Sequence, residues 1–548
     1  MVSLWYNKFI FFQGVSAHNP KPAQREAILY SIVSTAIVCG IQSVLIQVEA
    51  DVCDGMPAFE MVGVLSSEVK EAKERIRAAI RNSGIRLAPK KITVNLYPAD
   101  IRKSGTVFDL PIALAILAAY GRIPQEYLDD ILFAGEIGLN GEIRSTQGVL
   151  PMVLAAQEAG KKVVCVPREN IREAQIVKGV TILPGDNLNQ VTELIRAFFD
   201  GPEKFMENGL GNNDNNIEET GKKAQNADFD FASIHGQKIL KRACEIAASG
   251  RHNMLMLGSP GAGKTMAARA MATILPPLTE EEALELARVY SVMGMFGQRE
   301  MNFRQRPYRS PHHTISLAGM AGGGTIPKPG EISLAHKGVL FLDELTEFAK
   351  PVLETLRQPL EEQEIRLVRK SGTYFYPADV MLIGAMNPCN CGYFPDRNRC
   401  TCSKAMIERH LNKLSRPLID RMDICVEVSR PRLKELTAKQ PEECSAQIRS
   451  RVERTQRLQR ERFAGTGILY NSRIPSSAVE EWCVMETEGE TLMHESFERL
   501  KLTARGYYRV LRVARTIADM EGAKKIGHSH ICESLLYRSI DRKVWDWE

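Results

Sequence analysis

The feature that most constrains the fold of this 548-residue chain is a short apolar run followed directly by a glycine-rich loop. Met254–Leu257 has the composition of a central parallel strand, and Met266–Leu275 reads as a helix that two prolines end. Between them stands the pattern GxxxxGK[ST], made of Gly258, Ser259, Pro260, Gly261, Ala262, Gly263, Lys264 and Thr265. With a strand before it and a helix after it, this loop predicts a phosphate-binding P-loop in an α/β fold.

The residues of the loop suit a nucleoside triphosphate with its metal. Glycines let backbone N–H groups turn inward around phosphates, and the N-terminus of the following helix adds a favourable dipole. We expect Lys264 to reach the β- and γ-phosphates and the Thr265 hydroxyl to ligate Mg²⁺. ATP and Mg²⁺ are therefore the predicted cofactors.

A second apolar run, Gly338–Leu342, ends in the two carboxylates Asp343 and Glu344. A buried strand that delivers acids at its carboxyl end is what metal-dependent phosphate chemistry needs. We expect Asp343 to hold the metal through water, and Glu344 to orient and deprotonate the attacking water. The alternative, two acids that cap the next helix, explains one carboxylate better than two.

A third strand is predicted over Val380–Ala385, and Asn387 follows it. At that position a polar side chain could reach the water opposite the γ-phosphate. An Asn before a proline is also a common turn former, but the place after the strand favours the catalytic interpretation.

The chain divides into segments of different composition. We interpret residues 1–30 as an extension that is disordered or spurious, and residues 31–200 as a mixed α/β domain. Residues 201–228 are rich in Asn and charge, which predicts a flexible linker. A second α/β domain follows over residues 229–430. Residues 431–548 predict a helical domain.

Two long charged helices are predicted in that last segment, over Pro431–Arg462 and Ser496–Glu521. The net charge of +5 is too small to argue for nucleic acid by itself, so any basic contact surface must be local. No stretch has the roughly 18 consecutive apolar residues that span a bilayer. Twelve cysteines in so long a chain suit reduced thiols, so we expect a cytoplasmic protein with no membrane contact.

Several blocks of this sequence resemble the Mg-chelatase-like AAA+ ATPases of the YifB/ComM type. They are Arg306–Thr314, Gly330–His336, Gly338–Glu344, Met386–Cys389, Leu418–Asp423 and Ala514–Asp519. The resemblance covers nearly everything from about Ser31 onward except the linker. It implies a P-loop AAA+ parallel-sheet core with a helical lid, ATP hydrolysis, and a homo-oligomeric ring that is hexameric in the family's manner.

In such rings one subunit donates an arginine to its neighbour's γ-phosphate, and Arg421 matches that residue. The family motif reads SGPLLDR, whereas Arg416 here replaces the glycine, so it could alter the loop or compete for the same role. Arg505 matches the lid arginine that senses nucleotide. For either matched arginine the alternative is a surface helix charge.

The N-terminal half resembles the Lon-protease-like domain of this family, an α+β fold of the ribosomal S5 domain 2 type, in Ala99–Gly105 and Phe108–Ala113. A working Lon site needs a serine nucleophile and a lysine that activates it. Val107 stands where Lon has its serine, Gly148–Gly160 has no lysine at the expected position, and Ser104 is displaced in register. The resemblance therefore predicts a non-proteolytic domain for interaction or assembly.

Four cysteines form the pattern C-x-C-x8-C-x-C: Cys389, Cys391, Cys400 and Cys402. Four thiolates suit tetrahedral Zn²⁺. The C-x-C spacing is tighter than the usual two to four intervening residues, so zinc and plain reduced thiols both stay open.

Two alternating runs joined at residues 370–372 predict a β-hairpin that carries Arg366, Arg369 and Lys370. Related ring motors project such a hairpin into their pore, where these side chains could contact phosphates without reading sequence. The alternative is a solvated hairpin with routine surface charge.

ComM-type relatives are DNA branch-migration helicases, so the resemblance implies a motor on single-stranded or branched DNA, in DNA processing or transformation. A chelatase-like remodeller of a protein partner, without nucleic acid, is the second hypothesis. The pair His312-His313 could line the same channel or satisfy local backbone groups.

Overall fold

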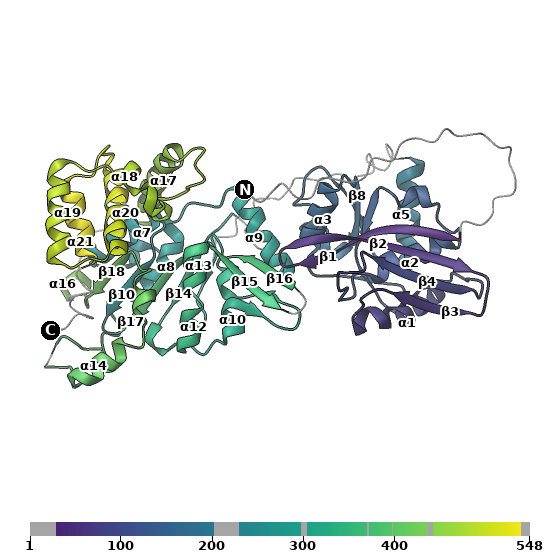
Figure 1. The fold of residues 1–548 in the computed structure, drawn as a ribbon, viewed down its shortest axis with the longest axis horizontal. Coiled ribbons are helices and arrows are strands. Elements are labelled where there is room, and N and C mark those ends of the chain that lie inside the picture. The colour runs from purple at the N-terminus through teal and green to yellow at the C-terminus, as the bar shows by residue number, and fades with distance from the viewer. Residues whose placement is uncertain are drawn as a thin grey trace.

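The structure, a computed structural model, describes residues 29–201, 229–296, 304–369, 372–396, 398–431, 433–436 and 442–538. Nearly all of the predicted extension and linker, and also Lys370, lie outside the described residues. Figure 1 shows two α/β bodies with separate sheets, and a group of helices that covers the end of the second body farthest from the first. No helix among the described residues is long and apolar enough to cross a membrane.

The first body is built on a seven-stranded sheet with the order β3-β4-β2-β1-β5-β8-β9. Its strands are β1 (Tyr30–Cys39), β2 (Gln42–Cys53), β3 (Ala58–Val62), β4 (Lys91–Tyr97), β5 (Ile131–Phe133), β8 (Val163–Pro167) and β9 (Thr181–Gly185), with β6 (Glu136–Ile137) and β7 (Ile143–Arg144) forming a separate pair. Its helices are α1 (Ser67–Asn82), α2 (Asp109–Ala119), α3 (Val149–Glu158), α4 (Ile171–Ala174) and α5 (Leu188–Asp200).

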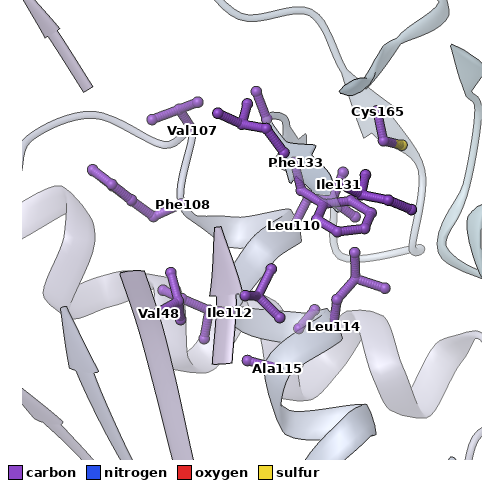
Figure 2. Packing of buried hydrophobic residues seen from close by; sticks show 14 of the residues in the cluster. Val48, Val107, Phe108, Leu110, Ile112, Leu114, Ala115, Ile131, Phe133 and Cys165 are labelled. Atoms are coloured by element: carbon purple, nitrogen blue, oxygen red, sulfur yellow. The ribbon is translucent and has the colours of Figure 1, made fainter. Parts of the chain in front are cut away.

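Helix α2 is the centre of this body, because every one of its residues is buried. Its apolar side chains pack with residues of β2, β5 and β8, as Figure 2 shows. The one charge at its start, Asp109, receives two hydrogen bonds from the guanidinium of Arg75 on α1, at 2.8 and 2.9 Å. A helix that is apolar all round belongs in a core, and its single buried acid is paired as the cost of desolvation requires.

The second body has a five-stranded parallel sheet with the order β11-β14-β17-β10-β18. The strands are β10 (Met254–Gly258), β11 (Tyr308–Arg309), β14 (Val339–Leu342), β17 (Met381–Met386) and β18 (Ile424–Val428). Around it lie α7 (Lys238–Gly250), α8 (Lys264–Ile274), α9 (Glu280–Val292), α10 (Leu317–Ala321), α11 (Glu331–Leu334), α12 (Lys350–Glu354), α13 (Arg357–Glu362), α14 (Lys404–Leu411) and α15 (Arg416–Ile419). Two antiparallel pairs are separate from the main sheet: β12 (Gly322–Gly323) with β13 (Lys328–Pro329), and β15 (Glu364–Arg369) with β16 (Gly372–Pro377).

The described C-terminal residues after β18 form helices and no strand. They are α16 (Leu433–Leu436), α17 (Ser445–Arg462), α18 (Val479–Trp482), α19 (Thr487–Arg499), α20 (Ala504–Glu521) and α21 (His528–Leu536). The two long helices predicted here are wrong in extent. The second is divided because Lys501 takes a left-handed φ of 46°, and because the Thr503 side chain accepts a hydrogen bond from Gly506 N–H to start α20.

Two of the contacts between the described parts of the first and second bodies fix how they meet. The backbone N–H of Gly148, before α3, donates to the carbonyl of Ser291 in α9 at 3.0 Å, and the Ser291 hydroxyl donates to Glu173. Burial raises the pKa of Glu173, against hydrogen bonds from Ser291 and from the Leu150 backbone. The β1–β2 turn lies beside the hairpin, since a Cβ on Gly40 would be 3.2 Å from the Phe375 carbonyl oxygen. The N-terminal body is thus anchored to α9 and to the β15–β16 hairpin.

Candidate nucleotide-binding site

The parallel strands bring three predicted elements to one edge of the sheet. Leu257 at the end of β10 pairs with Met386 of β17, and β17 in turn pairs with β14. The residues that follow these strands therefore meet at their carboxyl ends, where open α/β sheets bind ligands. The Lys264 ammonium donates to Asn387 Oδ1 at 3.1 Å, and the Thr265 hydroxyl donates to Asp343 Oδ2 at 2.7 Å.

The loop between β10 and α8 has the backbone of a phosphate cradle. Gly261 and Gly263 adopt φ angles of 76° and 93°, a left-handed region that favours glycine. Gly258 is required for a different reason: a Cβ there would lie 2.3 Å from the Val428 carbonyl oxygen of β18. Helix α8 begins at Lys264, so the free N–H groups of its first turn face the loop.

Lys264 is held over this loop by backbone carbonyls. Its ammonium donates to the carbonyl oxygens of Gly258 at 2.7 Å and Ser259 at 3.1 Å. Burial lowers the pKa of Lys264, while the charges of Asp343 and Glu344 act to raise it. The site fits an Mg²⁺-bound triphosphate, because it combines a hydroxyl–carboxylate pair, a glycine loop and a buried cation. Phosphate oxygens would bind the Lys264 ammonium more strongly than neutral carbonyls do.

Glu344 lies two residues after β14 in a strained backbone conformation, with φ 50° and ψ 49°. Its backbone N–H donates to Asp343 Oδ1 at 2.9 Å, and its side chain is 59% exposed. A carboxylate that faces open space beside the predicted metal ligands is placed to accept a proton from a water molecule.

The histidine pair left open by the sequence divides into two different environments. His313 Nδ1 lies 3.6 Å from Glu344 Oε2, whereas His312 Nδ1 lies 2.9 Å from the Thr314 hydroxyl. The two rings contact each other, with centroids 4.1 Å apart. His312 thus forms a hydrogen bond within its own loop, to Thr314. His313 lies beside the predicted base Glu344, and the sequence did not predict this proximity. The available signal was the position of the pair after β11, which runs parallel to β14.

The backbone carbonyl of Asn387 is held by a hydrogen bond from helix α14. The His410 ring in α14 makes a 3.0 Å hydrogen bond to the Asn387 carbonyl oxygen, and burial lowers the pKa of His410. The neutral ring can donate from Nε2 and so fix the turn that follows β17. The Asn387 amide is thereby held toward Lys264.

Arg421 lies at the opposite end of the same strands, beside their amino ends. It precedes β18, whose Ile424 pairs with Met254 at the start of β10, and Asn253 Nδ2 donates to the Arg421 carbonyl at 3.1 Å. The P-loop follows the other end of β10, about 13 Å away at about 3.3 Å per residue. Arg421 Nη2 contacts Glu361, while its Nε has no hydrogen-bond partner among the described residues.

Arg505 is exposed and belongs to the same edge as Arg421. It lies one helical turn before Arg509 in α20, and the Arg509 guanidinium lies 3.8 Å from Asp423 Oδ1 and 4.0 Å from Asp420 Oδ1. Asp420 directly precedes Arg421. Arg505 thus lies one turn from a residue that contacts the Asp420–Asp423 segment, and Arg421 lies beyond the amino end of β10, away from its own P-loop.

The predicted hairpin is confirmed as β15–β16, with pairs from Glu364↔Pro377 to Arg369↔Gly372. Arg366 and Arg369 are exposed, and the Arg366 guanidinium covers the Phe375 ring at 5.4 Å. Val368 and Phe375 are 64% and 45% exposed, so the hairpin carries apolar as well as basic surface.

The predicted zinc cysteines gather in one place. The Sγ atoms of Cys389, Cys391, Cys400 and Cys402 all lie within 4.8 Å of one another. The cluster directly follows Asn387 in the chain and is thus next to the phosphate site.

The position that matches the Lon serine is part of an apolar core. Val107 is buried and lies beside Phe108 at the start of α2 (Figure 2). Ser104 is half-buried, and its neighbour Lys103 is buried with its ammonium on the Pro98 carbonyl. Burial lowers the pKa of Lys103. No hydrogen bond joins Lys103 to Ser104 in the described part of the chain, so they do not form a serine–lysine pair there.

Three family models match successive parts of the chain. "Subunit ChlI of Mg-chelatase" matches residues 48–170, "Magnesium chelatase, subunit ChlI" matches residues 230–436, and "Magnesium chelatase, subunit ChlI C-terminal" matches residues 442–538.

Similar proteins cover almost the whole length. The competence protein ComM of Haemophilus influenzae is 40% identical over 522 residues, which are 94% of this chain and 98% of that protein. YifB of Escherichia coli is 39% identical over 514 residues, 93% of this chain and 97% of its own. An archaeal Lon protease of Thermococcus kodakarensis is 29% identical over 177 residues, 30% of this chain and 27% of its own. The chain belongs to the Mg-chelatase-like family of the YifB and ComM type.

Proposed function

We propose that this protein is an Mg-ATP-dependent AAA+ ring motor that acts on single-stranded or branched DNA in the cytoplasm. The observation that carries the ATPase proposal is the convergence of the Lys264–Asn387 and Thr265–Asp343 contacts at one edge of the parallel sheet, with Glu344 beside them. Family membership and this convergence support the same chemistry independently.

In this proposal each residue of the site has a separate task. Lys264 exchanges its carbonyl partners for β- and γ-phosphate oxygens, and Thr265 with Asp343 holds the metal. Bound Mg²⁺ supplies charge neutralisation across the phosphates. Glu344 accepts the proton of the attacking water, and Asn387 orients that water. Glu344 has a left-handed backbone, and its exposed carboxylate lies beside His313.

The edge position of Arg421 and Arg505 supports a ring. An arginine beyond the amino end of β10 is separated from its own P-loop by the length of that strand, whereas a neighbouring copy could present such an arginine to this pocket. Positive charge supplied only on assembly would couple hydrolysis to the oligomer. A homo-hexamer is the form that the family resemblance favours.

DNA is the proposed substrate because an exposed hairpin carries Arg366 and Arg369. Such cations bind phosphates without reading sequence. Similarity to a protein named for competence supports a role in DNA processing or transformation. The exposed apolar side chains of Val368 and Phe375 favour the second candidate, a chelatase-like remodeller that grips a protein partner.

ATP hydrolysis with and without single-stranded DNA, over a series of salt concentrations, distinguishes these two functions. Stimulation that fades as salt rises is expected for the DNA motor. Absence of stimulation at low salt, with hydrolysis intact, would leave the protein remodeller as the better account.

The double change Arg366→Ala and Arg369→Ala is expected to abolish the DNA stimulation. In a binding assay with single-stranded DNA, the slope of log affinity against log salt should become shallower by about 1.4, since two phosphate contacts are lost. Lys73→Ala with Arg81→Ala, two exposed cations of α1, is the matched control for net charge. An unchanged slope in the hairpin variant would exclude these arginines from the DNA contact.

We also propose that the first body is a Lon-like domain without protease activity, used for interaction or assembly. A serine-directed fluorophosphonate probe is expected to leave the protein unlabelled, because Val107 is a buried apolar residue and Ser104 lacks a lysine partner. Labelling that disappears in Ser104→Ala would contradict the proposal.

A further inference from the structure

The four-cysteine cluster is more than a set of neighbouring thiols. Its Sγ–Sγ distances are 3.3 Å for Cys389 with Cys391, 3.7 Å for Cys389 with Cys400, and 3.6 Å for Cys391 with Cys400. Four sulfurs bound at about 2.3 Å to a tetrahedral ion are separated by about 3.8 Å. The observed spacing therefore fits one ion at the centre, and it is too small for an iron–sulfur cluster, whose ligands surround several atoms.

The surroundings of the cluster suit a closed structural site. Cys389, Cys400 and Cys402 are buried, and they pack in one apolar cluster with Ile407 of α14. Thiols are weak hydrogen-bonding groups, so four of them collected in an apolar environment gain little from one another without a cation. All four positions of a tetrahedron would be filled by protein, which leaves none for substrate.

We propose that Cys389, Cys391, Cys400 and Cys402 bind one structural Zn²⁺, and that the loop folded around this ion supports the P-loop. The zinc part of this proposal is independent of the proposed function. The coupling to the P-loop rests on the proposed ATP binding.

Contacts from the cysteine loop to the P-loop carry the second part. A Cβ on Gly392 would lie 2.5 Å from Pro260 Cδ, so the two loops are in direct contact. Arg430 covers the ring of Tyr393 at 5.4 Å and donates from Nη2 to the Pro260 carbonyl at 3.0 Å. A single bridge thus runs from the cysteine loop through Tyr393 and Arg430 to the phosphate cradle.

The loop also begins at the catalytic edge of β17. Asn387 is two residues before Cys389, and its carbonyl is fixed by His410 of α14. An ion bound by all four cysteines would join the start of this loop, at Cys389 and Cys391, to its end, at Cys400 and Cys402. The end of the loop leads directly into α14, because Ser403 caps the start of that helix. Removal of the ion should release both Asn387 and Pro260 from their supports.

The first test is metal content, which needs no ATP. Full-length protein purified without chelators is expected to hold one zinc per chain by mass spectrometry, and Cys400→Ala should lose it. Cys244→Ala, which removes a buried thiol in α7 outside the cluster, should keep it. Iron in place of zinc, no stoichiometric metal after reconstitution with ZnCl₂, or full retention in Cys400→Ala would overturn the metal site.

Cobalt substitution of the wild-type chain keeps the test valid if Cys400→Ala fails to fold. The visible absorption of tetrahedral thiolate-bound Co²⁺ is expected, and octahedral or absent bands would reject the assignment.

The second test measures coupling. Stripping the ion with a mercurial and EDTA is expected to weaken binding of a fluorescent ATP analogue by about 10- to 100-fold, with zinc restoring it. The same treatment of Cys244→Ala should give the same loss. Unchanged affinity in metal-free, folded protein would leave a zinc site with no role at the P-loop, and would overturn the coupling alone.

Discussion

Glu344→Gln is expected to keep ATP bound while turnover falls by about 10²- to 10⁴-fold. Glutamine has the shape of glutamate and can still orient a water, but it cannot take the proton. Because the Glu344 side chain is 59% exposed and contacts His313 only at 3.6 Å, the change should not disturb the fold. Steady-state ATPase assays and binding of a fluorescent ATP analogue give the two readouts.

Glu347→Gln provides the matched control for Glu344. That carboxylate pairs with Lys413 at 3.1 Å and is also about half exposed, yet it lies beyond the predicted site. Its turnover should equal that of the unchanged protein. Full activity in Glu344→Gln, or loss of its ATP binding, would reject the assignment of Glu344 as the base.

Arg421→Ala is expected to reduce turnover by about 10³-fold or more, as for other arginines supplied across an interface. The physical reason is the position of Arg421 beyond the amino end of β10, away from its own P-loop, so that it would serve a neighbour's pocket once it leaves Glu361. Arg416→Ala changes an exposed charge five residues earlier and should have little effect. Equal losses in both variants would mean that the arginine in place of the family glycine shares the role.

Mixing the two inactive variants makes a sharper test of the ring. An Arg421→Ala subunit keeps Glu344, and a Glu344→Gln subunit keeps Arg421, so some interfaces in a mixed ring are complete. The mixture should regain ATPase activity that neither variant has alone. No recovery, with subunit exchange verified by sizing, would place the action of Arg421 within its own chain or remove it from catalysis.

The sequence predicted best what depends on neighbouring residues. The P-loop, the acids after β14 and Asn387 after β17 each follow a short buried strand, and parallel strands carry their ends to one edge. The hairpin was likewise predicted from its alternating residues.

Features set by long-range packing could not be read in this way. The approach of His313 to Glu344 depends on how β11 pairs with β14, and the Gly148–Ser291 bond joins segments from different bodies. The break before α20 was missed because a charged helical pattern continues through it, while the Thr503 cap and the left-handed Lys501 decide the boundary.

The most direct test of this account is calorimetric titration of the purified protein with ATP, with and without magnesium. We expect saturable binding of one nucleotide per chain that depends on Mg²⁺ and is lost in Lys264→Ala, since that ammonium is the only part of the cradle removed. Absence of binding in the presence of magnesium, by protein shown to be folded, would contradict the central claim that this edge of the sheet is a triphosphate site.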